Sequence, residues 1–282
     1  MLFGASTFIW CSPFSNEKLI LIDHAKRLGF DILEICVEDP RTIDTKRIAA
    51  RLWEAGLRAT VCGAFGPDRD MSAEDANGRA NALAYLRQCI EIAAALGAAS
   101  VVGPMYSAVG KTQFLEPAER RRQWRRAVES LQEAAAIAAD NEVKLGLEPL
   151  NRFETDLVNT VDQGLDMVRD IDRPNVGLLL DTFHMNIEEK DIPSAVRRAG
   201  GHIVEFHACS SDRGTPGEDH LPWPTIVSAL RDVDFRGPVV IEAFTPAIKE
   251  IARAVAIWRP LAESEDALAA NGLRHLRAAF ET

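Results

Sequence analysis

The sequence lacks the features that mark several other classes of protein. No stretch approaches the roughly 20 uninterrupted apolar residues that a transmembrane helix needs. With 32 basic and 42 acidic residues the formal charge is −10, which argues against a broad nucleic-acid-binding surface. Residues 1–10 have no basic flank and predict a first strand rather than a signal peptide. We therefore expect a cytoplasmic protein with no membrane or nucleic-acid partner.

Cysteine is scarce, and linkers rich in Pro, Gly and Ser are missing. The five cysteines include no CxxC pair and are odd in number. This pattern argues against a disulfide framework or a thiolate zinc site and favours a reducing compartment. Because no linker divides the chain, we expect residues 1–282 to form one domain.

What the sequence does contain is an alternation of short apolar runs with longer stretches of good helix formers. This alternation is typical of a parallel sheet covered by helices. Eight repeats in this length predict an α/β fold, a closed (β/α)8 TIM barrel. The predicted strands are Leu2–Ile9, Asp31–Val37, Leu57–Gly63, Ala98–Gly103, Val143–Pro149, Val176–Thr182, His202–Ala208 and Pro238–Phe244. The predicted helices between them are Asn16–Leu28, Thr45–Ala55, Ala76–Leu96, Pro117–Asp140, Thr160–Ile171, Ile192–Ala199 and Trp223–Val233.

The C-terminal tail is longer than a minimal barrel requires. Residues Ala247–Trp258 predict the eighth barrel helix, which Arg259 and Pro260 should end. Glu263–Phe280 then predicts an extra C-terminal helix. We expect this helix to cap the barrel floor, with a subunit contact or a lid over the site as the alternatives.

Four residues with metal-binding side chains stand near the C-terminal ends of the last four predicted strands. They are Glu148, Asp181, His207 and Glu242. An α/β barrel keeps its chemistry at this end of its strands. Three carboxylates and one imidazole form a mainly hard ligand set, which suits Mn²⁺, Mg²⁺ or Co²⁺. One acidic residue at a strand end is more often a loop or cap residue, but four in succession indicate a metal centre.

The same four residues predict a reaction. A divalent ion that they hold keeps open positions for a carbonyl and a neighbouring hydroxyl, which makes the adjacent C–H more acidic. Glu148 and Glu242 follow strands five and eight, on opposite sides of the barrel mouth. We expect one of them to remove a proton and the other to return it from the opposite face, inverting a carbon centre.

Three further polar residues lie close to these ligands in the sequence. Glu154 lies in the segment EPLNRFETD, His184 in DTFHMNIEE, and Arg213 in HACSSDRGTPGEDH, a loop rich in small residues. A carboxylate, an imidazole and a guanidinium around a bound polyol can supply the hydrogen bonds that orient its hydroxyls.

With these segments in view, the chain resembles the ketose 3-epimerase family, which includes the D-tagatose, D-allulose and L-ribulose 3-epimerases, within the xylose isomerase-like barrels. The resemblance runs from GASTFIW near the N-terminus to AIWR at Ala256–Arg259. Its most specific stretches are LEPLNRFETDLVNT and LLLDTFHMNIEE.

The resemblance implies a fold, an activity and a set of residues. It implies Mn²⁺ or Co²⁺, a cis-enediolate intermediate, reversible inversion at C3 of a free ketose, and a homodimer or homotetramer. The implied metal ligands are Glu148, Asp181, His207 and Glu242. The implied catalytic pair is Glu148 and Glu242, and the implied substrate-holding residues are Glu154, His184 and Arg213.

The wall that meets the C4–C6 end of the sugar is less closely matched to the family. We expect Ser6 and Cys62 to bind substrate there, together with wall residues Phe8, Phe65 and Met105. A neutral, apolar wall suits an unphosphorylated sugar, and no Gly-rich phosphate cradle occurs near strands seven and eight.

Several other functions remain open from the sequence. An aldose–ketose or hydroxypyruvate isomerase would use the same metal and glutamates, and an inosose dehydratase-like lyase is a more distant option. An endonuclease IV-like enzyme needs a three-zinc cluster with several histidines and a basic face, which this sequence does not offer. A non-catalytic sugar-binding protein would not need two glutamates on a metal.

Overall fold

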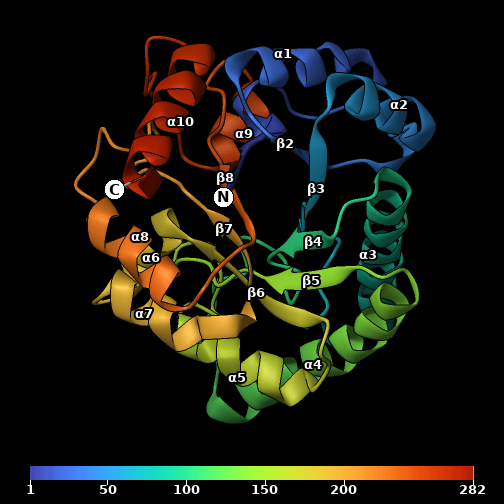
Figure 1. Cartoon of the computed structure of the whole chain (residues 1–282). Helices are drawn as coiled ribbons and strands as arrows, with labels where there is room; N and C mark the ends of the chain where they lie inside the picture. The colour runs from blue at the N-terminus through green and yellow to red at the C-terminus, as the bar shows by residue number, and fades with distance from the viewer. Residues whose placement is uncertain (282) are drawn as a thin grey trace.

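Eight parallel strands close into a barrel in the order in which they occur along the chain, and helices surround it (Figure 1). The structure is a computed structural model that describes residues 1–281, so Thr282, the last residue of the predicted domain, lies outside the described residues. The strands are β1 Leu2–Ser6, β2 Ile32–Val37, β3 Arg58–Gly63, β4 Ser100–Gly103, β5 Lys144–Leu147, β6 Val176–Asp181, β7 Ile203–His207 and β8 Pro238–Ile241. The predicted (β/α)8 TIM barrel is confirmed.

The helices lie between the strands and form the outer layer of the barrel. They are α1 Ile20–Leu28, α2 Thr45–Ala55, α3 Ala76–Leu96, α4 Pro117–Asp140, α5 Val161–Ile171, α6 Thr182–Glu188, α7 Ile192–Ala199, α8 Trp223–Asp232, α9 Lys249–Ala254 and α10 Glu265–Glu281. Gly29, Gly56 and Gly97 end α1, α2 and α3 with φ of 99°, 62° and 68°. These left-handed conformations favour glycine and let the chain leave each helix directly for the next strand.

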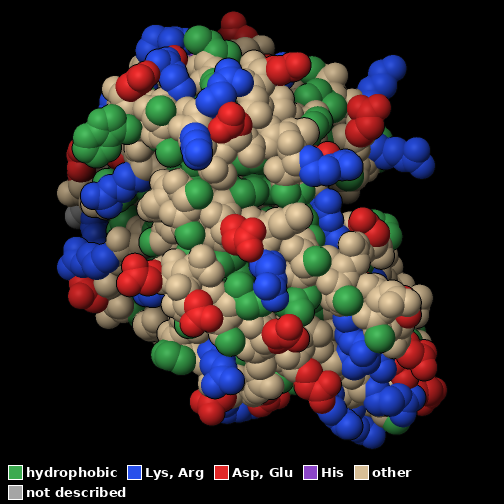
Figure 2. Space-filling model, turned by 90° about the vertical axis from the view of Figure 1, so that its right-hand side faces the viewer, with side chains coloured by type: hydrophobic (Ala, Val, Ile, Leu, Met, Phe, Trp, Pro, Cys, Tyr) green, Lys and Arg blue, Asp and Glu red, His purple; other side chains and the backbone are tan. Residues whose placement is uncertain are grey.

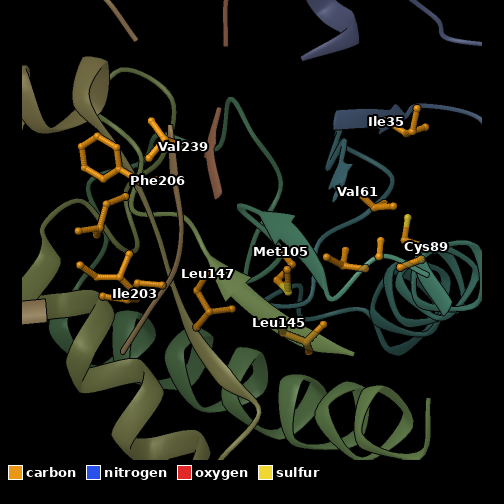
Figure 3. Close-up of a cluster of buried hydrophobic side chains, with 14 of the residues drawn as sticks. Ile35, Val61, Cys89, Met105, Leu145, Leu147, Ile203, Phe206 and Val239 are labelled. Atoms are coloured by element: carbon orange, nitrogen blue, oxygen red, sulfur yellow. The ribbon is translucent and has the colours of Figure 1, made fainter. Parts of the chain in front are cut away.

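Side chains along each strand alternate between the helix layer and the barrel interior. Leu33, Ile35 and Val37 of β2 belong to the hydrophobic core outside the strands, whereas Glu34 and Cys36 face inward. Figure 3 shows the outer core, with Val61 of β3 beside Cys89 of α3. The outer core is apolar and continuous, so it holds the strands in place without contributing chemistry.

The barrel interior contains several buried polar side chains. Large branched apolar residues usually occupy this position in TIM barrels. Here a second, smaller apolar cluster, which includes Cys36, Cys62, Val102 and Leu179, shares the interior with fully buried polar residues. Those polar residues are Ser6, Glu34, Thr60, Ser100 and Glu205. The polar interior lies beneath the ends of the strands where the four predicted ligands stand.

The tail departs from the predicted arrangement. α9 is limited to Lys249–Ala254, half the predicted length, and it does not take the place of the eighth barrel helix. The extra helix does so instead: α10 packs against α8, α1 and β8 in the outer ring (Figure 1). The expectation of a cap on the barrel floor is therefore wrong. α10 has buried positions such as Leu268, Leu273 and Leu276, which fill the gap between α8 and α1.

The surface carries charges of both signs. Figure 2 shows one face, on which acidic and basic side chains lie side by side. On α4, Glu119 pairs with Arg122 and Arg126, and Arg120 donates to the backbone carbonyl of Leu157. The basic run of this helix is therefore tied to neighbouring groups. Within residues 1–281, the helices are all too short or too polar to span a bilayer.

Candidate active site

The four predicted ligands meet at the C-terminal mouth of the barrel. One ligand atom from each of Glu148, Asp181, His207 and Glu242 lies within 4.8 Å of the others. Asp181 and His207 are the last residues of β6 and β7, and Glu148 and Glu242 directly follow β5 and β8. All four side chains are buried, with at most 7% of the residue surface exposed. The register of the barrel therefore brings together four residues that are far apart in the chain.

Asp181 also begins the following helix. Its Oδ1 accepts the backbone N–H groups of Phe183 (2.6 Å) and His184 (3.4 Å), so it is the N-cap of α6. A carboxylate is a favourable cap because it satisfies free N–H groups and faces the positive end of the helix dipole. The other oxygen, Oδ2, accepts the thiol of Cys209 at 2.9 Å. β6 thus continues into α6 without a loop, and the cap fixes the orientation of the Asp181 carboxylate.

His207 is held from below by a buried carboxylate. Its Nε2 lies 2.9 Å from Oε2 of Glu34 on β2, and both side chains are fully buried. Its Nδ1 points to the other side, 3.7 Å from Oδ2 of Asp181 and 3.9 Å from Oε2 of Glu242. No residue among 1–281 forms a hydrogen bond with Nδ1. A buried nitrogen without a partner is rare, so this atom needs a ligand at the centre of the cluster.

These residues fit a divalent cation. The donors are three carboxylates and one imidazole nitrogen, a set with the hardness that Mn²⁺, Co²⁺ or Mg²⁺ prefers. The unpaired Nδ1 of His207 faces two of the carboxylates, so one ion could contact all of them. Glu34 would then hold the second nitrogen of the ring, as carboxylates commonly do behind metal-bound histidines.

Without a cation, the three buried carboxylates of the cluster repel one another. Burial, together with the charges of Glu242 and Asp181, raises the pKa of Glu148 well above its usual value. Burial also raises the pKa of Glu242, to about 8. For Asp181, burial opposes ionisation, but the His207 side chain and the positive potential around it lower the pKa overall. Two of the three carboxylates thus resist ionisation unless a cation neutralises them.

The three predicted substrate-binding residues lie beside this cluster and are linked to it. Nε2 of His184 lies 3.6 Å from Oε1 of Glu148, and its Nδ1 accepts the backbone N–H of Asn151 at 3.0 Å. Because Nδ1 accepts this bond, the ring proton is on Nε2, and burial lowers the pKa of His184, which favours this neutral form. Arg213 donates to Oε1 of Glu154 at 3.0 Å. The side chains therefore form one polar wall along β5, β6 and β7.

Arg213 is held in an unusual conformation. Its φ of 64° lies in the left-handed region, which side chains other than glycine rarely adopt. The guanidinium is buried between two aromatic rings, 4.2 Å from the centroid of Phe183 and 5.0 Å from that of Phe244. It also donates to the carbonyl of Val255, just after α9, at 3.2 Å. Backbone strain of this kind persists where the surroundings fix a functional side chain.

Ser6 and Cys62 stand on the opposite wall, and their proposed contact with substrate stays a prediction. Ser6 is fully buried, and its hydroxyl accepts the backbone N–H of Phe8 at 3.3 Å and lies 3.1 Å from Sγ of Cys36. Cys62 is 5% exposed and pairs in register with Cys36 on β2. This wall offers only weak hydrogen-bonding groups.

Two buried glutamates in the interior were missed by the sequence analysis. Glu34 holds His207, and Glu205 lies two residues before His207 on β7, where Ser100 donates to it at 3.1 Å. Burial, reinforced by the nearby Glu34, raises the pKa of Glu205 to about 8. The available signal was the strand pattern itself, because both glutamates interrupt apolar runs at positions that face inward.

Comparison with known proteins agrees with this geometry. Residues 22–279 match the family described as the xylose isomerase-like TIM barrel. The chain is 37% identical to a probable ketose 3-epimerase of Synechocystis, over 99% of this chain and 97% of that protein. It is 32% identical to a D-psicose 3-epimerase of Ruminiclostridium cellulolyticum, over 91% of this chain and 88% of the relative. A crystal structure of D-allulose 3-epimerase from Methylomonas matches with a TM-score of 0.93 and 32% identity, over 99% of this chain and 98% of that one. The chain therefore belongs to the xylose isomerase-like TIM barrels and, among them, to the ketose 3-epimerases, which are isomerases.

Proposed function

We propose that this protein catalyses the reversible inversion of C3 in a free ketose, with a divalent cation, Mn²⁺ or Co²⁺, at the cluster of Glu148, Asp181, His207 and Glu242. Mg²⁺ also suits these donors. The observation that carries the proposal is the pairing of Glu148 and Glu242, two buried glutamates that follow β5 and β8 and share one cluster. The named relatives act on D-psicose, D-allulose or L-ribulose, so we expect a ketose of this kind as substrate.

The two glutamates divide the proton transfers. One removes the proton at C3 to give a cis-enediolate, and the other returns a proton from the opposite face. Burial raises the pKa of both glutamates, which favours this role because a carboxyl group that holds its proton more tightly can return it as well as accept it. When bound, the cation supplies Lewis-acid stabilisation of the negative charge on the substrate.

The polar wall orients the substrate. Arg213 and Glu154 form an ion pair whose remaining donors and acceptors suit sugar hydroxyls, and His184 presents its Nε2–H beside Glu148. Because the stacking of Arg213 between Phe183 and Phe244 limits its motion, the hydroxyls it binds are fixed relative to the two glutamates. The wall thus holds C3 between the acid and the base.

The test of this function is a product analysis with and without cation. The protein is treated with a chelator, reloaded with Mn²⁺, and incubated with D-fructose, D-tagatose or L-ribulose before chromatography. We expect the C3 epimer of at least one ketose, formed only after reloading. The Glu242→Gln variant, loaded in the same way, is the control and should form none. An aldose product would assign the protein to the aldose–ketose isomerases, and no conversion of any ketose would contradict the proposal.

We also propose that the chain forms a homodimer or homotetramer through the loops at the barrel mouth. Phe114 and Phe153 are highly exposed, at 105% and 74%, and lie in the loops after β4 and β5. These loops are joined, because the backbone N–H of Gly110 donates to the carbonyl of Glu154 at 2.7 Å. Exposed aromatic side chains on adjoining loops mark a contact surface. Light scattering of the wild type and of Phe153→Ser tests this, since a monomeric wild type would contradict it.

The five cysteines are free and buried, which supports the expectation of a reducing compartment such as the cytoplasm.

A further inference from the structure

A niche with two thiols lies inside the barrel, next to the four-residue cluster. It consists of Ser6 on β1, Glu34 and Cys36 on β2, and Cys62 on β3, and we call it the thiol niche. Cys36 and Cys62 are direct register partners on neighbouring strands, and both face inward. The sequence pattern argues against a thiolate zinc site because it has no CxxC pair, but strand pairing rather than sequence proximity brings these two thiols together.

The spacing of the donor atoms in the thiol niche suits one cation. The sulfur atoms of Cys36 and Cys62 and one carboxylate oxygen of Glu34 lie within 4.8 Å of one another. In a tetrahedral zinc site with sulfur ligands, donor atoms are about 3.8 Å apart, so only small rotamer changes are needed. Oγ of Ser6, 3.1 Å from Sγ of Cys36, is a fourth donor atom at the same place.

An independent observation concerns the carboxylate of Glu34. Oε2 of Glu34 is occupied by His207, but Oε1 finds no hydrogen-bond partner anywhere in residues 1–281. Glu34 is fully buried, so the unpaired oxygen has no access to bulk water. A buried carboxylate oxygen in this situation is costly unless a cation or another donor satisfies it.

The electrostatic potential in the niche also favours a cation. The hydrogen bond with Cys36, burial and the nearby Glu34 raise the pKa of the Cys62 thiol well above its usual value, and Glu242 adds to this effect. The same negative potential that resists thiolate formation attracts a positive ion. A thiophilic ion makes the thiolate form favourable, because the ion replaces the thiol protons, which pass to solvent.

From these contacts we propose that the thiol niche is a second metal site, which binds a thiophilic divalent cation such as Zn²⁺ through Cys36, Cys62 and Glu34. Two sulfur donors select a softer ion than the oxygen-rich cluster beside them, so the protein has a hard site and a soft site that share Glu34 as a common neighbour.

Occupation of the niche should inhibit the enzyme. An ion there neutralises the charge of the carboxylate that holds His207, places positive charge near Glu242, and fills the wall at Cys62. All three changes disturb groups of the proposed reaction, so Zn²⁺ should inhibit even when Mn²⁺ is saturating. This consequence rests on the proposed function, whereas binding to the niche does not.

Cadmium binding to the Mn²⁺-loaded full-length protein tests the site directly. Cd²⁺ is titrated under reducing, thiol-free conditions while the ultraviolet cadmium–thiolate charge-transfer band and the bound Mn²⁺ are measured. We expect one Cd²⁺ per chain, with an intensity for two thiolates and with Mn²⁺ retained. Cys36→Ser and Cys62→Ala should each weaken Cd²⁺ binding at least about tenfold. Cys89→Ser, a buried thiol on α3 outside the niche, is the matched control and should bind as the wild type does.

Two results would overturn the proposal. One is a full band in a folded Cys36→Ser/Cys62→Ser protein, which would assign the thiolate to Cys209 beside Asp181. The other is release of one Mn²⁺ for each Cd²⁺ bound, which would place Cd²⁺ in the hard site. Circular dichroism establishes that the variants fold. Because the band is read without substrate, failure of the ketose assay leaves this test intact.

Discussion

The two sides of the barrel mouth differ in the strength of their polar groups. The side of β5 to β8 carries four carboxylates, two imidazoles and a guanidinium, and all of them except Glu154 are buried. The side of β1 to β3 offers a substrate only a hydroxyl and two thiols, which form weak hydrogen bonds, because the Glu34 carboxylate on this side is bonded to His207. The strong side can fix the reacting carbons and their charge, and the weak side can only shape the space around the rest of the sugar. We therefore expect losses of reaction rate from changes on the first side and modest changes of preference from the second.

The largest expected effect is on the strong side, at Glu148. Glu148→Gln keeps the size of the side chain but removes the base, so turnover should fall by about 10²-fold to 10⁴-fold or more. Glu205→Gln is the matched control, because it changes a buried glutamate of the same barrel that is not one of the four ligands. Kinetics of both variants with the best ketose, after circular dichroism, measure the difference. Substantial turnover by Glu148→Gln would remove it from the proposed pair.

The next effect concerns Glu34, which lies on the weak side and holds His207 on the strong side. Glu34→Gln removes the charge behind His207, and the affinity for Mn²⁺ should fall by about 10-fold to 100-fold. The signal of free Mn²⁺ in electron paramagnetic resonance gives this affinity without any turnover. Glu34→Asp should recover part of it. If Glu34→Gln binds Mn²⁺ as tightly as the wild type, Glu34 does not position His207.

Removal of the cation should make the stability of the folded chain depend on pH through Glu242. The pKa of Glu242 is raised by burial from 4.5 to about 8 in the folded chain, so the folded state holds a proton that the unfolded state has lost. Stability is then fully present below pH 4.5 and falls as pH rises towards 8. The Tm of chelated protein should drop between pH 6 and pH 8.5, and less so in Glu242→Gln. An equal slope in both proteins would contradict this origin.

The smallest expected effect is at Ser6 on the weak side. Its hydroxyl already accepts the N–H of Phe8 and contacts Cys36, and a single such bond contributes about 1 kcal/mol. Ser6→Ala should therefore change kcat/KM by about threefold or less for every ketose tested. A large loss confined to one ketose would instead show that Ser6 binds that sugar.

Much of the architecture could be predicted from sequence because its signals are local and repeated. The apolar runs of β2 and β6 and the glycines after α1, α2 and α3 mark the elements directly. The four candidate ligands were recognisable because Asp181 and His207 end their strands, and Glu148 and Glu242 come one residue after theirs. The assumption that a barrel brings strand ends together was sufficient to group them.

The remaining features depend on contacts between distant parts of the chain. Glu34 reads as one acidic residue in DILEICV until the register of β2 places it against His207. α6 was missed because its cap, Asp181, is also a strand residue, and a strand that passes into a helix has no turn signal between them. The place of α10 depends on a gap between α8 and α1 that the short α9 leaves open. Local sequence patterns do not contain this information.

The absence of a loop between β6 and α6 has a consequence for the design of altered enzymes. Asp181 is at once the last residue of the strand and the cap of the helix, so an insertion on either side would separate the two roles. The connection from β7 to α8, residues 208–222, carries Arg213, and its central residues neither end a strand nor cap a helix. Loop grafts intended to enlarge the mouth should therefore be made near Glu218, which is exposed in this connection, and never at the β6–α6 junction.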